Sequence, residues 1–274
     1  LEPSGCEPFP RGGRAHTHLF FLSFHREYTQ AVRSDDFTKY LRKELDSTKS
    51  LLPHLDDPMK RQIIDAACSM NPGKPLVNVG RQFLAQGCPI PIDQQRYFNY
   101  QNAIYFVQQH TLSELSKEQL VELFKETQIL LAQNLEQDEP YILGQYRTGY
   151  MIVDGVGDPE KLIARIQELF HGQPLHDFIA SYNTVLKDVT HLGRLTAHEK
   201  TLWNEIAHIP CPPDQIKNEV ELFCQTLSER LKAPIIDYLD LASFVHMQFA
   251  RIWAYPDANG RLARLFMNEI LRLG

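Results

Sequence analysis

Five residues near the C-terminal end have the types and spacing of a phosphate-binding site. They are Asp257, Asn259, Gly260, Arg261 and Arg264, and they fall at the start of a predicted helix. The unpaired N–H groups and the dipole of a helix start attract anions. Glycine lets a phosphate approach the backbone, the asparagine amide donates hydrogen bonds, and arginines three apart share a helical face. The carboxylate can hold a divalent cation that bridges phosphate oxygens.

Each of these features also has a purely structural interpretation. Asn-Gly is a common turn dipeptide, and two arginines on a helix usually face water. Their combination between two apolar helical patterns favours the anion site.

The helix before the site must position it. Apolar residues recur at three- and four-residue steps from Ile235 to Ile252, which predicts one buried face on a helix that begins at Pro234. His246 lies within this pattern and is interpreted as a packed core histidine rather than a catalyst. A short loop at 253–258 then leads to a second apolar helix from about Asn259.

The rest of the chain predicts a mainly helical protein with one hairpin-like interruption. The Gly/Pro-rich residues 1–14 are expected to be disordered. Residues 141–153, rich in aromatic and β-branched types, predict a short strand or hairpin. Thr111 and Glu114 fit a capping box. Helices are predicted at 36–52, from 56–58 onward, at 97–109, after Thr111, and at 160–170, 176–187, 197–207 and 215–231.

Composition excludes several classes. The 274 residues carry a formal net charge of −6, so no broad basic surface indicates nucleic-acid binding. The apolar run at 19–22 is far too short for a membrane span, which takes about 20 residues. The five cysteines show no CxxC spacing, so they indicate neither a zinc site nor a disulfide framework.

The loop and the second helix resemble the motif of the Fic (Fido) family. Residues 252–264 read I-W-A-Y-P-D-A-N-G-R-L-A-R, and the usual family form is I-H-P-F-x-D-G-N-G-R-x-x-R. His246 matches a histidine often found seven residues before the motif histidine. Residues 144–148, G-Q-Y-R-T, are similar to the G-x-Y-R-x stretch that begins the family's β-hairpin flap.

The resemblance implies a fold and an activity. The fold is mainly α, a Fic/Fido helical fold with a short β-hairpin flap. Such proteins typically transfer AMP from ATP to a hydroxyl side chain of a target protein. By resemblance, Mg²⁺ and ATP are the cofactors, and Asp257 binds the metal. Asn259, Gly260, Arg261 and Arg264 hold the phosphates, and the flap residues Tyr146, Arg147 and Thr148 align the target chain.

The resemblance also suggests how the chain is divided. Residues 1–96 are expected to form an N-terminal helical extension with a disordered start. Residues 97–274 are expected to form the Fic domain, with an insertion at about 155–208.

The chain departs from the family pattern at the position of the general base. Trp253 stands where the motif has histidine, Ala254 and Tyr255 replace the proline and phenylalanine, and Ala258 replaces a glycine. An indole nitrogen is only a donor. General-base assistance contributes about 10²–10⁴-fold, so the sequence predicts impaired transfer.

Two functions from different classes stay open. One is a nucleotidyltransferase, or a related phosphate-group transferase, that works with another base. The other is a pseudoenzyme that binds a nucleotide or a peptide without transferring anything. Both predict a nucleotide and a protein as partners, with no nucleic acid and no membrane. The expected location is the cytoplasm, or a host cell into which the protein is delivered as an effector.

Overall fold

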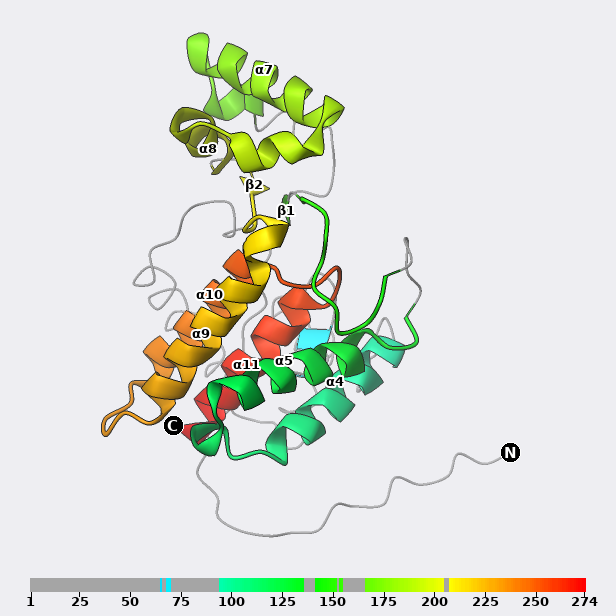
Figure 1. Ribbon diagram of the computed structural model, residues 1–274, viewed down its shortest axis with the longest axis vertical. Coiled ribbons are helices and arrows are strands. Elements are labelled where there is room, and N and C mark those ends of the chain that lie inside the picture. Colours follow the sequence, from blue (N-terminus) through cyan, green and yellow to red (C-terminus); the bar gives the residue numbers. More distant parts are fainter. Residues whose placement is uncertain are drawn as a thin grey trace, which may run out of the picture.

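The computed structural model describes residues 65, 68–69, 94–135, 141–151, 153–154, 166–204 and 207–274 of the chain (Figure 1). The expectations for 1–14, 36–52 and 56–58 lie outside these residues. Within them the protein is mainly helical, as predicted. None of the described helices is both long and apolar enough to cross a bilayer.

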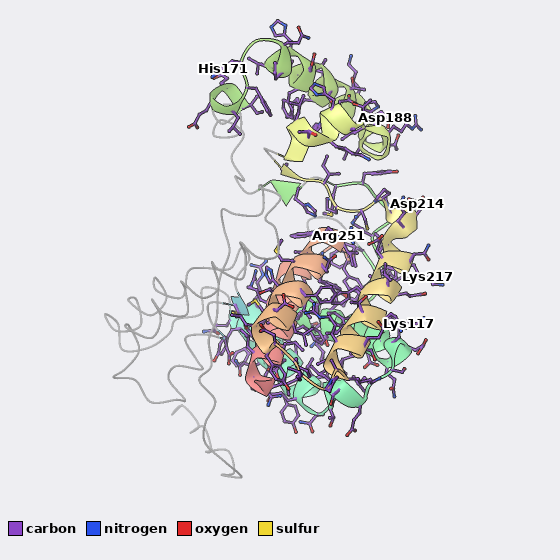
Figure 2. The ribbon with its side chains drawn as sticks, turned by 90° about the vertical axis from the view of Figure 1, so that its left-hand side faces the viewer. Lys117, His171, Asp188, Asp214, Lys217 and Arg251 are labelled. Atoms are coloured by element: carbon purple, nitrogen blue, oxygen red, sulfur yellow. The ribbon has the colours of Figure 1, made fainter. Side chains whose placement is uncertain are left out.

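Two hydrophobic cores divide the described residues into two lobes (Figures 1 and 2). The helices of the main lobe are α4 (Gln94–Gln108), α5 (Lys117–Ala132), α9 (Ile216–Leu231), α10 (Tyr238–Ile252) and α11 (Asn259–Leu273), with the short 3-10 turns η1 (Leu112–Glu114) and η3 (Pro213–Gln215). The small lobe contains α7 (Gln173–Lys187), the 3-10 turn η2 (Val189–Arg194) and α8 (Ala197–Asn204).

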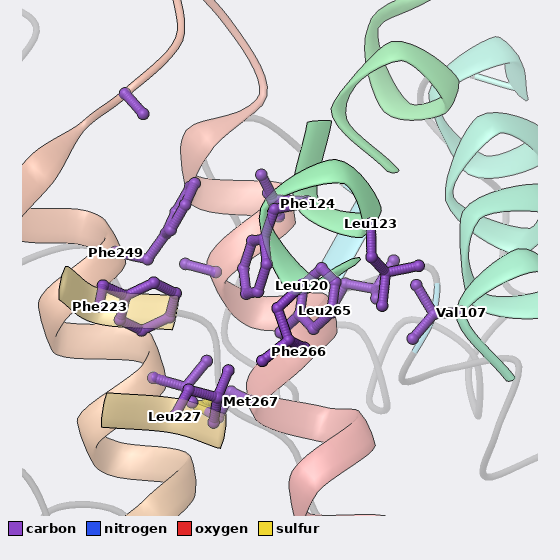
Figure 3. Packing of buried hydrophobic residues seen from close by; sticks show 14 of the residues in the cluster. Val107, Leu120, Leu123, Phe124, Phe223, Leu227, Phe249, Leu265, Phe266 and Met267 are labelled. Atoms are coloured by element: carbon purple, nitrogen blue, oxygen red, sulfur yellow. The ribbon is translucent and has the colours of Figure 1, made fainter. Parts of the chain in front are cut away.

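Helix α11 lies at the centre of the main lobe. Every residue from Asn259 to Ile270 except Gly260 is buried, so α11 is enclosed by α10, α5 and α4. Phe124 of α5 stacks on Phe266 of α11 with ring centroids 3.8 Å apart and on Phe249 of α10 at 5.0 Å (Figure 3). This aromatic stack fixes the helix that carries the candidate site against its two neighbours.

The small lobe packs around Phe178 and Trp203. Their ring centroids are 5.0 Å apart, and the indole Nε1 of Trp203 donates to Ser181 Oγ at 3.0 Å. The two chain segments that join the lobes pair as β1 (Val153–Asp154) and β2 (Ala207–His208), which are antiparallel with Val153 opposite His208. The boundaries predicted at 96/97 and for an insertion at 155–208 remain predictions.

The predicted hairpin at 141–153 takes a different form. Within the described residues, 141–151 form no strand, and the two-residue strand β1 pairs with β2 rather than with its own neighbours. Of the described residues in the predicted range, Val153 alone lies in a strand, and its partner strand follows the small lobe in the chain.

Two predicted helix starts were wrong. Thr111 makes no side-chain cap; the capping box belongs to Ser116 and Gln119 at the start of α5. Helix α10 begins at Tyr238, where Asp237 accepts hydrogen bonds from the N–H groups of Leu239 and Asp240, and not at Pro234. The carboxylate of Asp237 caps the helix and so determines where it starts. Ile235 therefore lies outside the helix and is 90% exposed.

Candidate functional site

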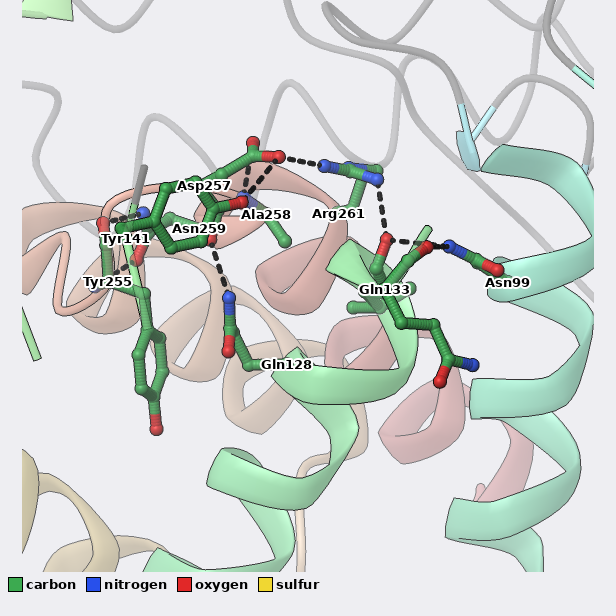
Figure 4. A network of polar contacts seen from close by, with 10 residues as sticks. Asn99, Gln128, Gln133, Tyr141, Tyr255, Asp257, Ala258, Asn259 and Arg261 are labelled. Atoms are coloured by element: carbon green, nitrogen blue, oxygen red, sulfur yellow. Dashed lines mark hydrogen bonds and ion pairs between the residues drawn. The ribbon is translucent and has the colours of Figure 1, made fainter. Parts of the chain in front are cut away.

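The loop between α10 and α11, residues 253–258 and here called the motif loop, has two left-handed residues. Trp253 has φ 49° and ψ 59°, and Ala258 has φ 70° and ψ 1°. Asn259 braces the loop between them: its Nδ2 donates to the Tyr255 carbonyl at 2.6 Å and its Oδ1 accepts from the Tyr255 N–H at 2.9 Å. The Asn259 side chain therefore shapes the loop (Figure 4).

The first turn of α11 leaves amide hydrogens available. The first backbone bond of the helix runs from the Leu262 N–H to the Ala258 carbonyl at 2.8 Å. Within the described part of the chain, the N–H groups of Asn259, Gly260 and Arg261 donate to no acceptor. These three donors and the helix dipole can bind an anion.

Arg261 is buried and paired inside the protein. Its Nη2 donates to Asp257 Oδ2 at 2.8 Å and its Nη1 to the Leu131 carbonyl at the end of α5 at 2.7 Å (Figure 4). Its side chain is 1% exposed. Burial lowers the pKa of Arg261, and the charge of Asp257 opposes that shift. In this conformation Arg261 joins the motif loop to α5, and its guanidinium does not face solvent.

Arg264 is also directed inward. Its Nε and Nη2 donate to the Cys68 carbonyl at 3.2 and 3.1 Å. A Cβ on Gly260 would lie 3.2 Å from Arg264 Nη1, so the glycine leaves room for this guanidinium. The structure thus brings both arginines to the helix start, where Arg261 donates to the Leu131 carbonyl and to Asp257, and Arg264 donates to the Cys68 carbonyl.

Asp257 is the one charged residue of the motif loop. Its side chain is 30% exposed, and it accepts from the Ala258 N–H and, at 3.4 Å, from the Tyr141 hydroxyl as well as from Arg261. No group of three or more His, Cys, Asp or Glu residues among the described ones could hold a metal ion. A cation at Asp257 would therefore find fewer than three such ligands among the described residues.

Residues 141–151, here called the flap segment, lie against the motif loop. Tyr146 packs on Tyr255 with ring centroids 5.5 Å apart, and Arg147 is buried, whereas Thr148 is exposed. Of the three residues predicted to align a target, Thr148 is the one whose side chain faces solvent most fully.

Two residues of this site were not predicted. Gln128 of α5 accepts from the Gly144 N–H at 2.8 Å and donates to the Asp257 carbonyl at 3.3 Å, so it joins the flap segment to the motif loop. Tyr141 is the other residue, and its hydroxyl donates to Asp257 Oδ2 at 3.4 Å. Gln128 has a signal in the sequence, because it is a polar residue on the apolar face that Phe124 and Leu131 define.

Replacing Gly144 by alanine is expected to destabilise the protein by about 2 kcal/mol. Gly144 has φ +74°, and an added Cβ would lie 2.8 Å from Cδ1 of Ile129. Denaturant titration measures the loss. Gly149→Ala is the matched control, because nothing lies within 4 Å of its Cβ position; equal losses in the two variants would contradict the assignment.

His246 is a fully buried residue of α10, as the core interpretation predicted. Burial, with a smaller contribution from the charge of Arg264, lowers its pKa to about 3. The unfolded chain, with an ordinary histidine pKa near 6.5, therefore binds more protons between about pH 3 and 6.5.

Stability is consequently expected to be complete above pH 6.5 and to fall as the pH drops toward 3. His246 alone contributes a loss of about 2 kcal/mol between pH 7 and pH 5. Unfolding midpoints across this range, compared with those of His246→Gln, measure the effect. Burial also lowers the pKa of His208, which stays in both proteins and cancels in the comparison. Parallel pH profiles would contradict the prediction.

Comparison with known protein families identifies the family of the chain. The model of the Fic/DOC family matches residues 114–271, which is more than half of the chain. The chain belongs to the Fic/DOC family. The match includes the flap segment, the small lobe and the motif loop. No curated protein sequence shows significant similarity to the chain.

Solved structures of Fic proteins are similar at low identity. One is a Fic family protein from Desulfovibrio desulfuricans G20, with 14% identity and a TM-score of 0.42 over 90% of this chain and 60% of that one. Another is a Fic domain containing signaling protein from Bacteroides thetaiotaomicron VPI-5482, with 15% identity and a TM-score of 0.42 over 87% of this chain and 74% of that one. The chain thus spans less than two thirds of the first structure.

Proposed function

We propose that this Fic-family chain binds the phosphates of ATP at the first turn of α11 and transfers AMP to a protein hydroxyl only weakly or not at all. The observation that carries the proposal is the juxtaposition of three N–H groups without acceptors, among the described residues, with Trp253 at the position of the family's general base. The donors support binding, and the indole withholds the base.

His246 does not replace the missing base. It lies seven residues before Trp253 on α10, about 10 Å along a helix, and its side chain is fully buried. A target hydroxyl cannot reach a nitrogen enclosed in the core. Its lowered pKa also makes it a weak proton acceptor.

Asp257 fits a magnesium ion that arrives with the nucleotide. Mg²⁺ is commonly held by one or two carboxylates together with substrate phosphates and water, and Asp257 supplies one partly exposed carboxylate. The ion would neutralise phosphate charge. Asp257 also balances Arg261, so a bound cation and Arg261 would share this carboxylate.

Calorimetric titration of the purified chain with ATP, with and without Mg²⁺, tests the proposal. Saturable binding that strengthens with Mg²⁺ is expected, and Asp257→Asn should reduce the Mg²⁺ dependence more than it reduces binding without metal. Arg251→Met, which removes an exposed charge from the last turn of α10, is the control. Absence of saturable binding under both conditions would refute the proposal.

A second candidate is a protein-interaction module that binds no nucleotide. It is favoured by one observation, the occupation of Arg261 and Arg264 by internal carbonyls. In that case Arg261→Met would lower the stability of the protein. ATP would change the melting temperature of neither the unaltered chain nor the Arg261→Met variant. For both candidates, the proposed partner is a protein that contacts the flap segment, in the cytoplasm or in a host cell.

A further inference from the structure

Arg147 of the flap segment lies at the C-terminal end of α10, where it binds the backbone of several segments. Its Nε donates to the Trp253 carbonyl at 2.7 Å, its Nη1 to the Gly149 carbonyl at 2.7 Å, and its Nη2 to the carbonyls of Cys211 and, at 3.4 Å, Ile252. Its own N–H donates to the Ala254 carbonyl at 3.0 Å. A single residue thus holds the start of the motif loop.

Among the described residues, the charge of Arg147 is balanced by a helix end rather than by a carboxylate. The residue is 5% exposed, and all its acceptors among the described residues are backbone carbonyls. The last carbonyls of a helix carry partial negative charge and lack intrahelical partners. A guanidinium suits this position because its planar donors reach several carbonyls at once, which an ammonium on a flexible stem does not do equally well.

The chain that returns from the small lobe completes the same junction. His208 Nε2 lies 3.1 Å from the Arg251 carbonyl, and the Cys211 thiol donates to the Ile252 carbonyl at 3.4 Å. On the other side, the Tyr150 ring packs directly against Gly193 of η2. The flap segment, the small lobe and the end of α10 therefore meet around Arg147.

Trp253 is held in an unfavourable backbone conformation at this junction. It is the C-cap of α10 in the left-handed region, which glycine and asparagine prefer. Its N–H donates to the Phe249 carbonyl, and its carbonyl accepts from Arg147 Nε. Arg147 thus bonds to the carbonyl side of this left-handed residue.

We propose that Arg147 is a positioning residue: it fixes the left-handed conformation of Trp253 and so couples the flap segment and the small lobe to the shape of the motif loop. A target protein that displaces the flap segment would then alter the loop that presents the phosphate-binding helix start. The effect of a target protein on the helix start rests on the proposed function. The positioning role of Arg147 concerns the protein without any ligand.

The two tryptophans of the chain make the coupling measurable. Trp203 is buried in the small lobe, and Trp253 is partly exposed in the motif loop. In a Trp203→Phe background, the fluorescence of Trp253 is the only tryptophan signal. Arg147→Met is expected to shift its emission to longer wavelength and to increase its quenching by acrylamide, and Arg147→Lys should give an intermediate change.

Two controls separate positioning from general destabilisation. Arg251→Met removes a neighbouring surface charge and should leave the emission unchanged. Leu227→Ala removes a core side chain of α9 and should lower the melting temperature without moving the emission. If Arg147→Met does not fold, the comparison is decided on Arg147→Lys, which keeps the charge.

Titration with ATP forms the second arm. If about a tenth of the variant molecules keep the competent loop, ATP affinity falls about tenfold. Unchanged Trp253 emission and quenching in folded Arg147→Lys would overturn the proposal, whatever the ATP result. If the Arg147 variant changes the Trp253 emission but the unaltered chain binds no ATP, the positioning role is upheld and the proposed nucleotide function is refuted.

Discussion

Replacing Trp253 by histidine is expected to raise AMP transfer from ATP to protein hydroxyls by about 10²–10⁴-fold. The imidazole restores a group that can accept the proton of the attacking hydroxyl at neutral pH, which indole cannot do. The helix start that we propose to bind phosphate, with its unbonded N–H groups among the described residues, lies beside it. Incorporation of labelled AMP into a cell lysate, at saturating ATP and Mg²⁺, measures the gain.

The backbone at residue 253 favours this substitution. Its left-handed conformation is several-fold more common for histidine than for most other residues with a side chain. Trp253→Phe is the control, because it changes the size of the ring without adding a base. Strong transfer by the unaltered chain would contradict the prediction. So would a histidine variant that binds ATP and transfers nothing.

A proline at position 254, as in the family motif, belongs in a separate variant. The residue before a proline is pushed toward extended backbone, whereas Trp253 is left-handed. Ala254→Pro therefore changes the conformation of the loop as well as its sequence. Comparing Trp253→His with the double variant separates the contribution of the base from that of the loop.

Asp257→Ala is expected to destabilise the main lobe by about 3 kcal/mol. The reason is the partner left behind: Arg261 has a side chain that is 1% exposed, and the Asp257 carboxylate 2.8 Å away is its counter-charge. Removing one member of a buried pair leaves a desolvated charge that the protein must stabilise. Chemical denaturation followed by Trp253 emission in a Trp203→Phe background measures the loss.

A double-mutant cycle identifies the source of that loss. Asp257→Leu combined with Arg261→Met removes both charges and should cost less than the sum of the single changes. Glu219→Ala is the surface control: it breaks the pair with Arg251, whose side chain is 49% exposed, and should cost less than about 1 kcal/mol. Additive losses in the cycle would show that Asp257 stabilises the protein through other contacts.

The periodic helices could be predicted from the sequence, because their stripes of apolar residues are local information. The start of α11 at Asn259 and the extent of α9 agree closely with the prediction. The start of α5 was predicted wrongly, since both Thr111 and Ser116 offer a hydroxyl and the capping box forms at Ser116 with Gln119. The pairing of Val153 with His208 could not be predicted, because it depends on how the small lobe folds between them.

The candidate site shows the same division. Sequence spacing placed Asp257, Asn259 and the two arginines at one helix start, and the structure brings them together there. The spacing could not reveal where each guanidinium points, because that depends on the carbonyls of Leu131 and Cys68, which come from distant parts of the chain. The inward course of Arg147 was hidden for the same reason.

The pairing of β1 with β2 also bears on how the chain tolerates changes of length. Val153 and His208 are direct neighbours, so the chain leaves the main lobe for the small lobe and returns to it at the same place. Closing a longer or shorter loop between fixed ends changes the free energy only with the logarithm of its length, about 0.6 kcal/mol per doubling. The main lobe can therefore accommodate large differences in the small lobe, provided that the residues around Arg147 keep their contacts.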